Sequence, residues 1–290
     1  MGWTNYHGHC EYCDGQGKIE DYITTAIDLK MHALGISSHA PLPFPTDWNM
    51  PGYRLSSYLK EVDYLREKYS EEITVYKSLE VDYIPGLASP SSKMVQDAKL
   101  DYTVGSVHFV GQLHNGDYWS VDAPVNEFEQ GLEETFVGDI KAAVCRYYAL
   151  QREMLQEGTP DIIGHMDKVK MHNKALHLFD EQAAWYIDEV HKTLELAKEK
   201  NVIVEINTKA YYRDGQLFPG PEHFAAIKAM DIPITINSDA HRANKLDNAF
   251  ADVATLLLEA GFTHLRELID GQWCDVAFST EGIEMPVSIQ

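Results

Sequence analysis

The sequence contains no apolar stretch approaching the roughly 20 residues that cross a bilayer, and its N-terminus lacks a basic region followed by an apolar run. We therefore expect no membrane partner and a cytoplasmic location. Internal repeats, low-complexity tracts and long linkers rich in proline, glycine and serine are also missing. The 290 residues are accordingly expected to form one domain that spans positions 1–290.

Positive charge is scarce as well. The chain has 24 lysines and arginines against 45 aspartates and glutamates, and its formal net charge is -21. This balance argues against a nucleic-acid partner, because binding to a phosphate backbone depends on a surface of lysine and arginine. A compact anionic substrate is still compatible with the charge if bound divalent ions supply local positive charge.

Cysteine is too rare for a disulfide framework in a chain of this length. The four cysteines are Cys10, Cys13, Cys145 and Cys274. The first two form a CxxC pair without a second pair downstream, and His7 and His9 lie too close in sequence to complete a zinc knuckle. The pair is also not placed between a strand and a helix as in thioredoxin-like proteins. We expect both thiols to be packing residues.

What the chain does contain is an alternation of short β-rich runs and longer amphipathic segments, which predicts parallel strands with helical crossovers. The seven predicted strands are 3–7, 34–38, 73–79, 102–107, 161–164, 202–206 and 232–237. The predicted helices are 19–33, 55–68, 126–157, 180–200, 221–230 and 246–260. One β/α barrel is the simplest fold with these elements, and its active site would lie at the carboxyl ends of the strands.

An insert after the fourth predicted strand, "VGQLHNGDYWSVD" at 110–122, interrupts this alternation. Loops at the carboxyl end of a barrel strand often build or cover an active site. A surface hairpin without a functional role is the alternative, and the sequence leaves both open.

Residues able to bind metal follow the carboxyl ends of the predicted strands. They are His7, His9, Asp14, His39, Glu80, His108, His165, Asp239 and His241. Side chains two positions apart on an extended segment share a face, so His7 and His9 can reach one ion, and so can Asp239 and His241. Nine ligands are too many for one tetrahedral ion and suit a cluster of two or three ions that share a bridging carboxylate.

The order of these motifs carries a family resemblance. The pattern HxH, "CDG", "SSHAP", "LEVDY", "GSVHF", "GHMD", "EINT" and "NSDAH" closely resembles the polymerase and histidinol phosphatase (PHP) superfamily, and within it the L-histidinol-phosphate phosphatases. The likeness runs from His7 to His241, nearly the whole chain. It implies an α/β fold, a distorted seven-stranded barrel of the TIM type, with a trinuclear metal centre.

The resemblance also implies how the ligands are grouped. The first ion would be held by His7, His9, Glu80 and Asp239, the second by Glu80, His108 and His165, and the third by Asp14, His39 and His241. Glu80 would bridge the first two ions. Mixed nitrogen and oxygen ligands suit zinc, iron or manganese and do not select among them.

The activity implied is hydrolysis of a small phosphate monoester, L-histidinol phosphate, to L-histidinol and inorganic phosphate in histidine biosynthesis. We expect a hydroxide bridging two ions to attack phosphorus, with Glu80, Asp239 and His241 acting through the ions that they bind. Arg213 is the leading candidate to bind phosphate oxygens, because guanidinium binds them in a bidentate way. A solvated loop charge is the alternative role for Arg213.

Other residues and other substrates are compatible with the sequence. Lys209 and Arg242 are weaker candidates than Arg213 for the phosphate partner, and Glu205 and Asn207 are expected to support the ligands or pack. Acidic side chains near the rim could recognise the amine and imidazole of histidinol, although the sequence does not indicate which. A PHP phosphoesterase that acts on nucleotides or other small phosphate esters is the alternative function. The sequence does not indicate an oligomeric state.

Overall fold

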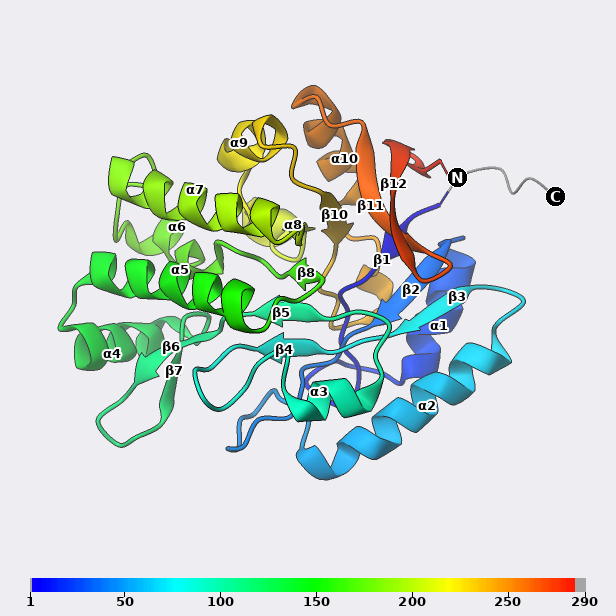
Figure 1. Cartoon of the computed structure of the whole chain (residues 1–290), viewed down its shortest axis with the longest axis horizontal. Coiled ribbons are helices and arrows are strands. Elements are labelled where there is room, and N and C mark those ends of the chain that lie inside the picture. The colour runs from blue at the N-terminus through cyan, green and yellow to red at the C-terminus, as the bar shows by residue number, and fades with distance from the viewer. Residues whose placement is uncertain (1, 285–290) are drawn as a thin grey trace.

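The computed structural model describes residues 2–284, in which parallel strands are surrounded by helices (Figure 1). The parallel strands are β1 (Thr4–Asn5), β2 (Ala33–Ile36), β3 (Thr74–Lys77), β4 (Glu80–Asp82), β5 (Val104–Ser106), β8 (Ile162–Ile163), β9 (Ile203–Asn207) and β10 (Ile234–Asn237). All seven predicted strands are confirmed, with β4 continuing the third one. β9 and β10 are rich in β-branched residues and buried throughout, as expected for strands covered on both faces.

The parallel strands close into a ring. One sheet has the order β1-β2-β3 and the other the order β10-β9-β8-β5-β4. The parallel bridge between His39 and Glu80 joins the two sheets on one side, and the bridge between Gly8 and Ala240 joins them on the other. The expected α/β fold is therefore present, with seven strand positions around the ring.

Helices form the outer layer of the molecule (Figure 1). The α-helices are α1 (Ile19–Asp28), α2 (Leu55–Lys68), α3 (Lys93–Ala98), α4 (Val125–Phe136), α5 (Ile140–Glu157), α6 (Asn173–Leu176), α7 (Ala184–Glu199), α8 (Tyr211–Asp214), α9 (Phe224–Ala229) and α10 (Phe250–Glu259). Four 3-10 turns are η1 (Gly52–Arg54), η2 (Lys168–Lys170), η3 (Pro221–His223) and η4 (Ala243–Lys245). Among residues 2–284, no helix is long and apolar enough to cross a membrane.

The single helix predicted at 126–157 is wrong, because the chain breaks it into α4 and α5. Val137 and Gly138 both adopt positive φ angles, 54° and 74°, which end α4. Asp139 then caps α5, since its carboxylate accepts a hydrogen bond from the Ala142 amide at 3.0 Å. The apolar face of α5 continues the amphipathic pattern of α4, which is why the break was not expected.

The insert at 110–122 belongs to an antiparallel hairpin, β6 (Phe109–Gln112) and β7 (Tyr118–Ser120). Trp119 turns inward from β7 and packs against Phe128 of α4, with ring centroids 5.5 Å apart. Gly131 permits this approach, because a Cβ atom there would lie 1.9 Å from the Trp119 ring. The hairpin is therefore anchored to the helix that follows it.

A C-terminal antiparallel sheet that the sequence did not predict closes the amino end of the ring. Its strands are β11 (His264–Ile269), β12 (Gln272–Ser279) and β13 (Gly282–Ile283). Leu268 and Trp273 pack with the first residues of several parallel strands, including Ala33, Val104 and Ile203. In Figure 1 β11 and β12 lie beside the N-terminal strand. The carboxyl ends of the parallel strands therefore face the opposite end of the ring.

Glu267 of β11 is a buried carboxyl group at this amino end. Thr4 Oγ1 and Tyr6 Oη both donate hydrogen bonds to its Oε2, at 2.6 and 2.8 Å. Burial nevertheless raises the pKa of Glu267 to about 7, since these two hydrogen bonds only partly offset it. The pKa of Glu267 is therefore higher in the folded protein than in the unfolded chain. Such a group favours the folded state while it is protonated, so its contribution to the free energy of unfolding is lost as the pH rises from about 4.5 through 7.

We therefore expect the free energy of unfolding of Glu267→Gln to stay constant over the pH range in which that of wild type falls. A glutamine oxygen can accept the same two hydrogen bonds, and the side chain does not ionise. Between pH 4.5 and 8 the variant should gain about 3 kcal/mol relative to wild type. Urea unfolding at several pH values measures this difference, with the exposed Glu259→Gln as the control. Parallel stability profiles for wild type and Glu267→Gln would contradict the expectation.

Candidate metal centre

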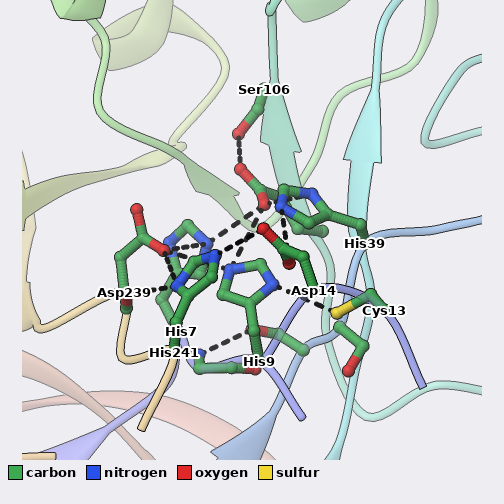
Figure 2. Close-up of polar contacts among 12 residues, drawn as sticks. His7, His9, Cys13, Asp14, His39, Ser106, Asp239 and His241 are labelled. Atoms are coloured by element: carbon green, nitrogen blue, oxygen red, sulfur yellow. Dashed lines mark hydrogen bonds and ion pairs between the residues drawn. The ribbon is translucent and has the colours of Figure 1, made fainter. Parts of the chain in front are cut away.

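The nine predicted metal-binding residues meet at the carboxyl end of the ring. Figure 2 labels six of them: His7, His9, Asp14, His39, Asp239 and His241. His7 and His9 follow β1, and Asp14 lies in the loop before α1. Glu80 opens β4, and the other five follow their strands directly: His39 after β2, His108 after β5, His165 after β8, and Asp239 and His241 after β10. The ring thus brings together residues that are up to 234 positions apart, from His7 to His241.

Glu80 lies at the middle of this group. Its carboxylate oxygens lie near the imidazoles of His39 (2.8 Å), His165 (3.0 Å), His7 (3.3 Å), His9 (3.5 Å) and His108 (3.7 Å). Ser106 Oγ donates a further hydrogen bond at 2.6 Å. Burial opposes ionisation of Glu80, but the imidazoles outweigh it and hold its pKa well below the ordinary value. A buried, charged carboxylate in contact with several imidazoles has the placement that a bridging ligand requires.

The donor atoms fall into overlapping clusters, within each of which they lie at most 4.8 Å apart. The clusters are His9, Asp14, His39 and His241; His7, His165 and Asp239; His7, His9 and Glu80; and Glu80, His108 and His165. The second predicted set occurs as a cluster and the third occurs with His9 added. The first set is divided, because His7, His9 and Glu80 form one cluster whereas Asp239 groups with His7 and His165. Figure 2 shows the imidazoles of His9, His39 and His241 gathered around the Asp14 carboxylate.

Unpaired donor atoms inside the centre test whether metal ions suit these residues. His7 Nε2, His9 Nε2 and Glu80 Oε2 are buried, and although both nitrogens lie within 3.5 Å of that oxygen, none of the three atoms makes a contact with hydrogen-bond geometry within residues 2–284. Buried polar atoms are normally satisfied, so several unsatisfied lone pairs turned toward one space call for a cation. The donor set of imidazole nitrogens and carboxylate oxygens fits zinc, iron or manganese.

Carboxylates behind the imidazoles fix their orientation. His7 Nδ1 lies 2.6 Å from Glu205 Oε1, and His108 Nδ1 lies 2.8 Å from Asp82 Oδ1. Because a carboxylate accepts, each Nδ1 carries the proton and Nε2 is left with a lone pair for a ligand. Glu205 thus contacts a predicted ligand, as its expected supporting role requires. Asp82 was not anticipated, although its position two residues after Glu80 on one strand face could have indicated it.

Cys13 packs against the hydrophobic core as the sequence predicted, and it also contacts a predicted metal ligand. Its thiol lies 3.6 Å from His9 Nδ1, the nitrogen turned away from Glu80 (Figure 2). Cys10 is buried and contacts the Ser38 hydroxyl at 3.1 Å, in agreement with a packing role. Both cysteines are free thiols.

Above the centre lies a cavity of about 560 Å³, large enough for a small substrate. Two lysines line it. Lys209 Nζ lies 3.1 Å from Asp239 Oδ1 and 3.3 Å from His241 Nε2, and Lys168 Nζ lies 3.1 Å from Asp122 Oδ2. Lys168, which the sequence did not single out, belongs to η2, three residues after His165 in the segment that follows β8.

Arg213, the predicted phosphate partner, is not brought into this cavity. Its side chain is 62% exposed and pairs with the neighbouring Asp214 at 2.9 Å. The short helix α8 turns the chain outward after Lys209, so Arg213 lines a separate surface depression beside Met171. Arg242 is exposed and does not line the cavity either. Lys209, which the sequence suggested less strongly than Arg213 as a phosphate partner, is the residue that lines the cavity above the metal centre.

A ring of parallel strands with these side chains at its carboxyl end defines a barrel protein suited to hold several metal ions. Residues 5–209 match the model of the PHP domain, and the chain belongs to that family.

Relatives extend the match beyond the domain itself. A protein named "Probable histidinol-phosphatase" from Deinococcus radiodurans is 26% identical over 90% of this chain and 94% of its own length. The histidinol-phosphatase of Bacillus subtilis is 24% identical over 84% of this chain and 95% of its own.

Two solved structures share the fold. HisK of Listeria monocytogenes superposes with a TM-score of 0.75 at 19% identity, over 86% of this chain and 99% of its own. Histidinol phosphate phosphatase of Lactococcus lactis, solved with zinc, L-histidinol and phosphate, gives a TM-score of 0.69 at 19% identity, over 97% of this chain and 98% of its own. At these identities the superpositions support the fold alone.

Proposed function

We propose that this protein is a phosphatase that hydrolyses L-histidinol phosphate to L-histidinol and inorganic phosphate with two to three bound metal ions. The observation that carries the proposal is the convergence of nine imidazole and carboxylate side chains beneath a cavity lined by two lysines. The names of the relatives from Deinococcus and Bacillus support the choice of substrate. So does the content of the Lactococcus structure.

The ligand sets proposed for the ions build on the clusters in the structure, with Asp239 added to the first set because its Oδ1 lies 3.1 Å from His9 Nε2 and 3.9 Å from His7 Nε2. His7, His9, Glu80 and Asp239 would hold the first ion; Glu80, His108 and His165 the second; and Asp14, His39 and His241, joined by His9, the third. Ions bound there would lower the pKa of coordinated water and offset charge on the phosphoryl oxygens.

The lysines of the cavity would bind the phosphate group. Burial tends to lower the pKa of Lys168, but Asp122 and Asp239 outweigh it and hold the pKa above its usual value. Lys168 is therefore a permanent cation that binds an anion and does not give up its proton. Lys209, in contact with Asp239 and His241, can reach an oxygen of a phosphate bound over the same residues.

A substrate panel tests the proposal. Purified protein of known metal content should release phosphate from L-histidinol phosphate with a kcat/KM at least about 100-fold above nucleoside monophosphates and sugar phosphates, since the cavity holds specific polar partners. Comparable rates across the panel would refute the substrate. Protein that is active with less than one bound ion per chain would refute the metal centre.

Lys209 and Arg213, two of the three basic residues considered as phosphate partners, are expected to behave differently when they are replaced. Lys209→Met should lower kcat/KM by about 30-fold through loss of a charged partner of phosphate, whereas Arg213→Ala should change it less than about twofold. Steady-state phosphate release measures both variants. A loss with Arg213→Ala that equals the loss with Lys209→Met would restore Arg213 to the site.

A further inference from the structure

The hairpin of β6 and β7, whose role the sequence leaves open, returns to the metal centre at residues 120–123. The Val121 amide donates a hydrogen bond to the His108 carbonyl oxygen at 2.9 Å, which holds the end of the hairpin beside a predicted ligand. On its other side, His172 Nε2 lies 2.9 Å from the Ala123 carbonyl oxygen. The returning segment is therefore held between the residue that follows β5 and the chain that follows η2.

Asp122, in the middle of this segment, forms an ion pair with Lys168. Lys168 Nζ lies 3.1 Å from Asp122 Oδ2, and the Ser120 hydroxyl donates a hydrogen bond to the other carboxylate oxygen, Oδ1. Burial opposes ionisation of Asp122, but the Lys168 ammonium outweighs it and holds the pKa of Asp122 well below its usual range. Asp122 is therefore an anion whose two oxygens each have a separate partner.

Lys168 depends on this ion pair for its position in the cavity. Its side chain is only 9% exposed, and in the part of the chain that the structure describes, Asp122 is the only carboxylate that forms an ion pair with it. A lysine side chain is a flexible four-carbon stem, so using it to bind a ligand costs free energy unless another group already holds it in place. Asp122 is the group that can do so here.

The hairpin gives Asp122 a firm support. Trp119 of β7 packs against Phe128 of α4 with ring centroids 5.5 Å apart, and Thr135 Oγ1 of α4 donates a hydrogen bond to the Gln112 carbonyl oxygen of β6 at 3.3 Å. Figure 1 shows both strands beside α4. Because each strand is tied to the same helix, the position of Asp122 is fixed from behind.

We propose that Asp122 is a positioning residue, which holds the Lys168 ammonium in place over the metal centre, and that the insert at 110–122 serves to carry it. The inference rests on the phosphatase function proposed above, in which Lys168 binds the phosphate group. It makes the insert part of the phosphate site, although the carboxylate of Asp122 would by itself repel phosphate.

Binding of inorganic phosphate to the metal-loaded protein tests the proposal by its sign. If Asp122 acted through its charge alone, Asp122→Ala would bind phosphate more tightly, because a nearby negative charge is removed. We expect about fivefold weaker binding instead, since the freed lysine must lose rotamer freedom when it binds. Asp122→Asn should keep most of the affinity, because its oxygen still accepts a hydrogen bond from Lys168 Nζ. Isothermal titration calorimetry measures these affinities, with Asp117→Ala in the exposed turn of the same hairpin as the control.

A double-mutant cycle separates positioning from a general effect on the fold. Lys168→Met should weaken phosphate binding by about 30-fold, and Asp122→Ala should cause no further loss in that variant, because no ammonium is left to position. Losses that add in the double variant would overturn the proposal, as would unchanged or tighter binding by Asp122→Ala. Wild-type protein that binds phosphate but does not hydrolyse L-histidinol phosphate would refute the proposed function and leave this test of Asp122 intact.

Discussion

Glu80→Gln is expected to lower kcat by at least about 1,000-fold, because the ions supply several kcal/mol of transition-state stabilisation and the variant cannot hold them. The Glu80 carboxylate contacts five imidazoles and is 1% exposed. A glutamine has the same shape as glutamate but no charge. Its amide N–H groups would point at imidazole nitrogens that should bind metal ions, and would compete with those ions for the nitrogen lone pairs. Two ligand clusters share this one side chain, so both lose a member at once.

Three measurements check this expectation: metal content by elemental analysis, phosphate release and thermal unfolding. Bound metal should fall by at least one ion per chain in Glu80→Gln. Glu153→Gln, which replaces a half-exposed partner of Arg146 on α5, should keep both metal and activity. Full turnover with normal metal content in Glu80→Gln would show that Glu80 is not a bridging ligand.

The strands and the candidate ligands were predictable because both follow from short-range rules. Buried β-rich runs have few alternatives to a parallel sheet, and the geometry of a closed ring places the residues after each run at one end. His7 and His241 therefore approach each other although most of the chain lies between them. The residue types that bind metal are also few, so their recurrence at strand ends was informative.

Long-range packing accounts for what the sequence did not indicate. Arg213 and Lys209 are four positions apart, and only the turn of α8 decides which of them faces the cavity. Val137 adopts a left-handed conformation that its residue type does not suggest, so the break before α5 was missed. The C-terminal strands β11 and β12 pair with each other across a two-residue turn at Asp270 and Gly271, so a local hairpin signal was present, and only their packing against the amino end of the ring is long-range.

Glu205→Gln should have the second-largest effect on the centre, although Glu205 touches no proposed ion. Four donors surround its carboxylate. They are His7 Nδ1 at 2.6 Å, the His165 amide at 2.7 Å, and the side-chain amides of Asn207 and Asn237 at 3.0 Å each. A glutamine accepts through one oxygen only, so its own amide group must face two donors whichever way it is oriented. If it faces His7, the proton of that imidazole moves to Nε2 and blocks the ligand position.

We expect Glu205→Gln to weaken metal binding by about 10- to 100-fold, as when a residue that orients a ligand is replaced. Two unsatisfied buried donors should also lower the free energy of unfolding by about 3 kcal/mol. Zinc titration and urea unfolding measure these effects, with the exposed Glu195→Gln as the control. Adding excess zinc distinguishes the roles of the two acidic residues. It should restore much of the kcat of Glu205→Gln, because all the proposed metal ligands are present in that variant. It should not restore the kcat of Glu80→Gln, which lacks a ligand. Failure of zinc to restore Glu205→Gln would mean that Glu205 has a more direct part in the reaction than orienting His7.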